Sequence, residues 1–559
     1  MVFKLIMVER GNNYNIKYNM KKIIVIGGLS AGPSAAAKAR RIDEKSEIIL
    51  FEKTADISYA TCGIPYAISG EIKHRNQLLV VKPELLKQRF NIDVHLKEPV
   101  IYIDKEKQLV QTHKGTYTYD TLIFATGGTA FTPAIQGLKE FPNWAHAKSL
   151  QDFDKINESE QFKNAKHITI VGAGLIGLET AENIRKTGKK VTVIELANQI
   201  LTPWGTKFST LAKKVLENKG IEFKLETQIN KIHSNGQLEL SDASNLQTHF
   251  IIISIGTRSN TQLLASIGAK TMVNGALIVT KKMETSIPNI YAAGDCAAMP
   301  HALTHESAWF RMGTHSNKAG RVAGANAAGA NETFNGAYGT AIMKMFDYTI
   351  ARTGMGIKEL TRKKIAFKKT MIIANSHPGF MGIGKDMFIE IFYDRTSKIV
   401  LGAEFIGEKG IDKRVDVLAT AIYAKLTIHD LTNLDLAYVF LFSPAKDPVI
   451  VAGFVAQNFD KLEIKEISPK EISTLENTQI IDVRTKDEVK NTKLIASNAI
   501  HMPLDNLRNR LQELNPSKPY LLYCAKGLRG YLAALILQNH GFKDVTNLDG
   551  GFTAWNLML

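Results

Sequence analysis

Three cysteines are the residues of this chain best suited to redox chemistry, namely Cys62, Cys296 and Cys524. They lie far apart, so their spacing predicts neither a disulfide framework nor a zinc site, and we expect no metal. Cys62 precedes a predicted helix whose first turn tolerates Pro65. A helix N-terminus favours a thiolate, so Cys62 is a candidate reaction centre, with a buried packing cysteine as the alternative. We interpret Cys296 as such a packing residue.

A second candidate centre is Cys524, which follows an apolar run at residues 520–523. Gly527 comes three residues later, and an apolar helix is predicted from there to His540. A strand, a glycine-bearing loop and a helix in this order form a nest of backbone N–H groups. We expect these groups to point at the sulfur and to stabilise a thiolate or a persulfide anion.

A glycine-rich turn follows the first predicted strand, at residues 23–26. It reads Gly-Gly-Leu-Ser-Ala-Gly over residues 27–32, and a second strand ends at Glu52, about twenty residues later. This layout is typical of dinucleotide binding, with the pyrophosphate at the helix N-terminus and the acid on the ribose. Leu29 replaces the middle glycine, so an ordinary strand–turn–helix is the alternative.

The same fingerprint occurs again, in full, at residues 172–177. It follows a strand at 168–171, and the next strand ends at Glu195. Two such sites predict two bound nucleotides. A carboxylate at Glu195 binds a free 2′-hydroxyl and repels a 2′-phosphate, which favours NADH over NADPH, although Lys189 and Lys190 moderate this preference.

Two further apolar strands end in turns, at residues 119–127 and 285–295. With the two fingerprints, they resemble the signatures of the flavoprotein disulfide reductases that bind two dinucleotides. The resemblance implies FAD in the first site, NAD(P)H in the second, and Cys62 against the flavin. It assigns FAD to Gly27, Gly28, Ser30, Ala31, Gly32, Glu52, Lys53, Ala125, Thr126, Gly127, Gly294 and Asp295, and NAD(P)H to Gly172, Gly174, Ile176, Gly177, Glu179, Glu195 and Gly256.

The stretch from Ser58 to Tyr66 contains one cysteine only. It resembles the single-cysteine branch of that family, the coenzyme A disulfide reductases and the NADH oxidases or peroxidases. Residues 339–347 are similar to the start of that branch's dimerisation domain, which implies a homodimer. Residues 435–438 and 443–448 also resemble the coenzyme A disulfide reductases, in which a tyrosine at the position of Tyr438 reaches the partner subunit's cysteine. A core aromatic is the alternative for Tyr438.

The substrate end of the site departs from the family pattern at residues 439–442 and 380–382. The first predicted helix carries Lys38, Arg40 and Arg41 where this branch presents basic residues to coenzyme A. A solvated helix face is the alternative for these three. We also expect Ser58 to contact substrate, and the resemblance leaves open that coenzyme A stays bound.

From about residue 462 the chain resembles a single rhodanese domain, a sulfur-transfer module. The resemblance lies in residues 482–484, in the six-residue loop from Cys524 to Arg529, and in residues 549–555. It implies that Cys524 carries sulfur and that Arg529 contacts substrate. The usual turn of the family is replaced at residues 492–496.

The composition is that of a globular protein, with 559 residues of which 45% are hydrophobic and 22% charged. The net charge is +16, but the lysines are scattered, so we expect neither nucleic acid nor a membrane as partner. The sparse cysteines fit a reducing cytoplasm. Residues 1–20 are expected to be a disordered extension or to follow a start codon assigned too early.

Together these features predict an α/β chain with two Rossmann-like dinucleotide-binding domains, an α+β dimerisation domain and a C-terminal α/β rhodanese domain. The expected boundaries are 21–140 with 266–333 for FAD, 141–265 for NAD(P)H, 334–458 for dimerisation and 463–559 for rhodanese. The expected function is reduction of coenzyme A disulfide, coenzyme A persulfide or polysulfide through Cys62, coupled to sulfur transfer at Cys524. The alternatives are an NADH oxidase or peroxidase that cycles through sulfenic acid, and a redox-sensing scaffold with structural FAD.

Overall fold

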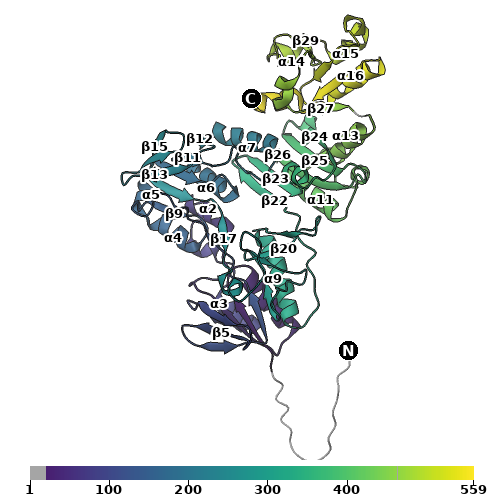
Figure 1. Ribbon diagram of the computed structural model, residues 1–559. Coiled ribbons are helices and arrows are strands. Elements are labelled where there is room, and N and C mark those ends of the chain that lie inside the picture. Colours follow the sequence, from purple (N-terminus) through teal and green to yellow (C-terminus); the bar gives the residue numbers. More distant parts are fainter. Residues whose placement is uncertain (1–19, 463, 559) are drawn as a thin grey trace, which may run out of the picture.

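The computed structural model describes residues 20–462 and 464–558, so nearly all of the expected N-terminal extension lies outside the described residues. Four units are each built on a five-stranded sheet. In Figure 1 the first unit lies at the bottom, the second at the left, the third at the centre right and the fourth at the top. Among the described residues, no helix has the length and apolar character that a bilayer crossing needs.

The first domain is a parallel sheet whose central strand, β1, is buried between neighbours. Helices α1 (Ala31–Ile42) and α9 (Gly313–Ala327) pack closely against each other, because glycines of α9 allow their backbones to approach. A Cβ on Gly324 would lie 2.0 Å from the Ala35 carbonyl oxygen. The sheet order is β19 (Ile290–Ala292), β7 (Thr121–Phe124), β1 (Lys22–Ile26), β2 (Glu47–Phe51) and β3 (Asp93–His95).

The second domain repeats this arrangement, and it is inserted between β7 and β19 of the first. Its helices include α6 (Leu175–Lys186), which follows the glycine turn, and α7 (Thr206–Asn218), which packs against β26 of the third domain. The parallel sheet has the order β12 (Ile221–Lys224), β11 (Lys190–Ile194), β10 (His167–Val171), β16 (Phe250–Ile253) and β9 (Trp144–His146).

The third domain is an antiparallel sheet with helices α11 (Ile411–Tyr423) and α13 (Pro448–Leu462) packed against it. Its long strands β24 and β25 form a hairpin whose tip spans residues 376–385. The order is β22 (Ala341–Met345), β23 (Tyr348–Gly354), β26 (Val400–Gly407), β25 (Asp386–Asp394) and β24 (Phe367–Asn375).

The C-terminal domain is again parallel, with α16 (Leu528–Asn539) and α17 (Gly551–Met558). Helix α17 packs against α7 of the second domain, so the fourth unit contacts the body of the molecule. Its sheet order is β27 (Lys465–Ile467), β31 (Val545–Leu548), β30 (Tyr520–Tyr523), β28 (Gln479–Asp482) and β29 (Ile500–His501). The four sheets confirm the predicted fold class.

Glu404 of β26 makes the stability of this assembly dependent on pH. Both of its carboxylate oxygens accept from the Gly205 N–H, at 3.0 and 2.9 Å, and burial, together with Glu390, raises its pKa from 4.5 to about 7. The native state therefore favours the neutral form of Glu404. Its contribution to the free energy of unfolding is full below pH 4.5 and is lost as pH rises through about 7. The loss amounts to about 3 kcal/mol.

We expect the melting temperature of the wild type to fall between pH 5 and pH 8 more steeply than that of Glu404→Gln, which holds a neutral side chain at every pH. Thermal melts of both proteins across this range measure the difference. Parallel slopes for the two proteins would show that Glu404 does not titrate in this window.

Candidate active sites

Cys62 lies in a 3₁₀ turn, Thr61–Gly63, that leads directly into α2 (Ile64–Ile68), and Pro65 occupies the first turn of that helix as predicted. The Cys62 side chain is exposed, whereas Cys296 and Cys524 are buried. The packing interpretation of Cys62 is therefore wrong. Because α2 has only five residues, its dipole stabilises a thiolate less than a full-length helix would.

The first glycine turn is shaped for close backbone contact. Gly27 has φ of +107°, and a Cβ on Gly32 would lie 1.8 Å from the Gly27 carbonyl oxygen. Ser30 makes no side-chain cap, and the first turn of α1 holds no acidic residue, so its N–H groups are available to an anion. Glu52 accepts from the Gly28 N–H at 2.8 Å. The turn, α1 and Glu52 fit the pyrophosphate and ribose of a dinucleotide.

The other residues predicted for this nucleotide surround the same turn. Ala125 is buried beside Gly27, the Thr126 hydroxyl donates to the Asn260 carbonyl at 2.6 Å, and Lys53 is exposed. The remaining members are glycines with positive φ and the first residue of α1: Gly127, Gly294 and Ala31.

Asp295 has partners that the sequence did not reveal. Its carboxylate lies 3.4 Å from Lys148 Nζ, and its carbonyl accepts from Trp309 Nε1 at 2.8 Å. The hydroxyl groups of Ser30 and Ser34 both donate to Asn317 Oδ1, which joins α1 to α9. These contacts link residues far apart in the chain, and no local spacing signals them.

The second glycine turn has the same geometry. Gly172 has φ of +104°, and a Cβ on Gly177 would lie 2.1 Å from the Gly172 carbonyl oxygen. Glu195 accepts from the Ala173 N–H at 2.7 Å, the counterpart of the bond from Gly28 to Glu52. Gly174 provides no side-chain cap to α6, Ile176 is exposed in its first turn, and Gly256 follows β16 with φ of +105°. This turn fits a second dinucleotide.

Glu179 lies in α6, which packs against α2, the helix that follows Cys62. Burial, and secondly Glu182, raises the pKa of Glu179 to about 7. Burial also raises the pKa of Tyr66 to about 12, with contributions from Glu179, Glu182, Glu71 and Cys62. Tyr66 therefore lies within electrostatic reach of both Glu179 and Cys62.

We expect NADH binding to weaken as pH rises through about 7, because Glu179 then becomes an anion in α6, the helix that follows the nucleotide turn. In Glu179→Gln this dependence should disappear. The dissociation constant for NADH, measured by flavin bleaching from pH 6 to pH 8.5, tests the prediction. The same slope in both proteins would assign the ionisation to another group.

The basic residues of α1 are not equivalent. Arg40 is 4% exposed, and its guanidinium donates to four backbone carbonyls at the ends of α1 and α3 (Pro83–Phe90). Its prediction as a coenzyme A ligand is therefore corrected: Arg40 is structural. Lys38 pairs with Glu332 at 2.7 Å, and Arg41 lies over the Phe90 ring.

Tyr438 belongs to an exposed apolar segment of the third domain. Tyr438 is 55% exposed, so the core-aromatic interpretation is wrong. We call the exposed residues 438–442 with Phe380 the aromatic strip; the rings of Phe380 and Phe440 lie 6.1 Å apart. The two departures from the family pattern, at residues 380–382 and 439–442, therefore lie on one surface. Ser58, with φ of 45°, donates its N–H to the Gly28 carbonyl at 2.8 Å, next to the first glycine turn.

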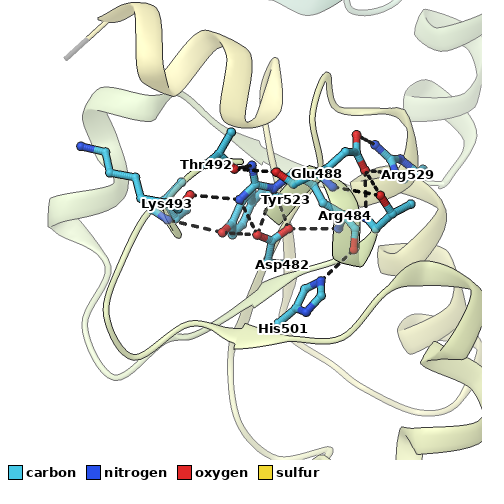
Figure 2. A network of polar contacts seen from close by, with 10 residues as sticks. Asp482, Arg484, Glu488, Thr492, Lys493, His501, Tyr523 and Arg529 are labelled. Atoms are coloured by element: carbon cyan, nitrogen blue, oxygen red, sulfur yellow. Dashed lines mark hydrogen bonds and ion pairs between the residues drawn. The ribbon is translucent and has the colours of Figure 1, made fainter. Parts of the chain in front are cut away.

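Cys524 follows β30 and is 2% exposed. Gly527, with φ of +105°, donates its N–H to the Cys524 Sγ atom at 3.1 Å, which is the one bond of the predicted nest that the structure records in the described residues. Arg529 ends the loop in a two-bond ion pair with Glu488, at 2.6 and 2.7 Å (Figure 2). The ion pair with Arg529 lowers the pKa of Glu488 to about 2, although burial alone would raise it.

Below the loop, the buried Arg484 binds Asp482, and Tyr523 donates to the same carboxylate at 2.7 Å (Figure 2). Arg484 also donates to the Thr492 hydroxyl and to the Lys493 carbonyl. The replaced turn at 492–496 thus still binds the core arginine.

Comparison with known proteins matches three family models to successive parts of the chain. Residues 21–326 match the model of the pyridine nucleotide-disulphide oxidoreductases, 340–442 that family's dimerisation domain, and 468–558 the rhodanese-like domain. A Pyrococcus horikoshii protein described as NAD(P)H coenzyme A polysulfide/persulfide reductase is 32% identical over 442 residues, which cover 78% of this chain and 98% of that protein. Coenzyme A disulfide reductase of Staphylococcus aureus is 30% identical over 448 residues, 78% of this chain and all of that protein.

Two solved structures cover almost the whole chain. The reduced CoADR-RHD of Bacillus anthracis has a TM-score of 0.93 at 34% identity and covers 97% of this chain and 99% of its own. An NAD-dependent persulfide reductase from A. fulgidus has a TM-score of 0.90 at 30% identity and covers 96% and 100%. Two nucleotide cradles, an exposed lone cysteine and these matches lead to one conclusion: the chain belongs to the pyridine nucleotide-disulphide oxidoreductase family, with that family's dimerisation domain and a C-terminal rhodanese-like domain.

Proposed function

We propose that the chain reduces coenzyme A disulfide, coenzyme A persulfide or polysulfide through Cys62. The observation that carries the proposal is that Cys62 is exposed while the other two cysteines are buried in other parts of the fold. Cys62 therefore has no disulfide partner within this chain. Its partner sulfur must come from the substrate, which agrees with the persulfide and disulfide substrates in the names of the relatives.

The family membership implies FAD and a nicotinamide nucleotide. When bound, FAD supplies transfer of two electrons from NAD(P)H to Cys62. The Cys62 thiolate attacks the disulfide or persulfide, forms a mixed disulfide with one sulfur and expels the other. Two electrons and one proton then restore the Cys62 thiolate and release the bound thiol. The partner subunit's Tyr438 gives that proton.

NADH is the proposed donor, because Glu195 lies where the 2′-hydroxyl of the nucleotide binds. A homodimer is proposed because the aromatic strip exposes several large apolar side chains, among them Phe442 at 71%. Three free thiols support the cytoplasm as location.

Cys524 is proposed to receive sulfane sulfur. Its thiolate attacks the outer sulfur of a persulfide, so that a Cys524 persulfide forms and the donor leaves as a thiolate. The persulfide then passes its outer sulfur to coenzyme A, whose persulfide is reduced at Cys62. The Gly527 N–H at 3.1 Å from the sulfur supports an anion there.

The test is an anaerobic flavin cycle on the holoenzyme. NADH should bleach the flavin within the mixing time of a stopped-flow instrument, and coenzyme A disulfide or persulfide should reoxidise it without oxygen. Reoxidation by oxygen or peroxide alone would assign an oxidase or peroxidase. A flavin that NADH does not bleach would assign a scaffold.

A further inference from the structure

The loop of Cys524 directs one recorded N–H group, that of Gly527, at the sulfur, and two of its carbonyls bind the first turn of α17. The Cys524 carbonyl accepts from the Phe552 N–H at 2.8 Å, and the Ala525 carbonyl accepts from the Thr553 N–H at 2.9 Å. In a trans peptide the carbonyl and the next N–H point in opposite directions. The first turn of α17 therefore fixes the orientation of the Ala525 and Lys526 N–H groups, which point opposite to these carbonyls.

The turn before α17 lies directly on this loop. Gly550 and Gly551 have φ of +68° and +57°, and a Cβ on Gly551 would lie 2.3 Å from the Cys524 carbonyl oxygen. Contact this close requires glycine. Loop and turn therefore act as one unit, and the residue that begins the turn is Asp549.

The Asp549 side chain binds outside its own domain. Lys207 Nζ, from α7 of the second domain, donates to Asp549 Oδ2 and, at 2.7 Å, to Glu390 Oε1 of the third domain. The three side chains are at most 8% exposed. In the described part of the chain Asp549 Oδ1 has no hydrogen-bond partner. The negative charge of the buried Asp549 carboxylate is therefore compensated by Lys207.

Residues of the second and third domains also hold Lys207 in place. Gly205, which precedes α7, donates its N–H to Glu404, and Glu404 is the cross-strand neighbour of Glu390. Burial would lower the pKa of Lys207, but Asp549 and Glu390 raise it above its ordinary value, so the amine is charged. The second and third domains thus hold a fixed cation, and the C-terminal domain supplies a carboxylate to it.

We propose that Lys207 is a positioning residue for sulfur transfer at Cys524. It acts from another domain, through Asp549 and the 549–553 turn, and keeps the amides of the loop directed at the thiolate. An ion pair that only joined two domains would affect the melting temperature. The pair of Lys207 and Asp549 also affects the reactivity of the Cys524 sulfur. The inference rests on the sulfur-transfer role proposed for Cys524, but alkylation of Cys524 tests it without assuming that role.

The experiment compares wild-type holoenzyme with Lys207→Met. Alkylation of Cys524 by iodoacetamide at pH 7, followed by mass spectrometry, should slow at least about fivefold, because fewer amides stabilise the thiolate. Cys62 in the same sample should react at the wild-type rate. In sulfur transfer from glutathione persulfide to cyanide, kcat should fall while KM stays unchanged.

Lys470→Met is the matched control. Lys470 Nζ donates to the Thr210 hydroxyl at 3.0 Å, so it joins the second and the C-terminal domain in an exposed position. The control should retain the wild-type alkylation rate of Cys524. An equal loss in both variants would show that domain contact in general, and not Lys207, controls the loop.

A second variant separates positioning from stability. Lys207→Met leaves Asp549 as an unpaired buried carboxylate, and adding Asp549→Asn removes that charge. The double variant should regain part of the lost melting temperature but not the alkylation rate, and Asp549→Asn alone should also slow alkylation. Recovery of the rate together with the melting temperature, or no effect of Lys207→Met, would overturn the proposal. A wild type without sulfurtransferase activity would refute the proposed role of Cys524, while alkylation still decides the positioning.

Discussion

Substitution Cys62→Ser is expected to lower NADH-dependent reduction of coenzyme A disulfide at least about a thousandfold, because loss of a covalent nucleophile costs that much or more. A serine hydroxyl forms no mixed disulfide with the substrate. Neither buried cysteine can replace Cys62. Steady-state NADH oxidation with each substrate under anaerobic conditions measures the loss.

The control for this variant is the first half of the cycle. NADH should still bleach the flavin of Cys62→Ser, because the two glycine turns and their carboxylates, Glu52 and Glu195, are unchanged. Retention of coenzyme A disulfide reduction above about a tenth of the wild-type rate would be incompatible with Cys62 as the redox cysteine.

The second large effect is expected at the other reaction centre. Cys524→Ser should lower NADH-dependent reduction of polysulfide at least about tenfold, because no persulfide forms in the nest beside Gly527. Reduction of coenzyme A disulfide requires no sulfur donor and should keep the wild-type rate. The two substrates, measured side by side with the same enzyme preparation, give the comparison.

Two outcomes would contradict this expectation. Unchanged reduction of both polysulfide and coenzyme A persulfide in Cys524→Ser would remove the coupling between the two centres. Loss of coenzyme A disulfide reduction as well would mean that Cys524 affects the reductase fold. The melting temperature and the flavin content of the variant distinguish the latter case from a specific effect.

The nucleotide turns could be predicted from the sequence because their geometry is local. Glycines at fixed spacing between a strand and a helix permit one backbone path, and Glu52 and Glu195 at the ends of the next strands then bind the amides of Gly28 and Ala173. The position of Cys62 just before a helix with Pro65 in its first turn followed from the same logic. Residues close together in the sequence therefore determine these parts of the site.

Arg40 shows where local reasoning failed. Its neighbours one turn earlier on the same helix face, Ala36 and Ala37, are buried, so the side chain crosses the core face of α1 before it binds carbonyls. The alanine spacing contained that signal. For Lys148 with Asp295, and for Lys207 with Asp549, no spacing contained one, because these pairs form only when separate domains or distant segments meet.

The packing of α17 on α7 also limits how this protein can be divided. Ala554 and Met558 belong to the same apolar cluster as Phe208 of α7 and Met371 of β24. A shortened protein that ends near residue 462 would expose this apolar surface together with the carboxylate of Glu390. The C-terminal domain of this chain is therefore part of the apolar core that it shares with α7 and β24.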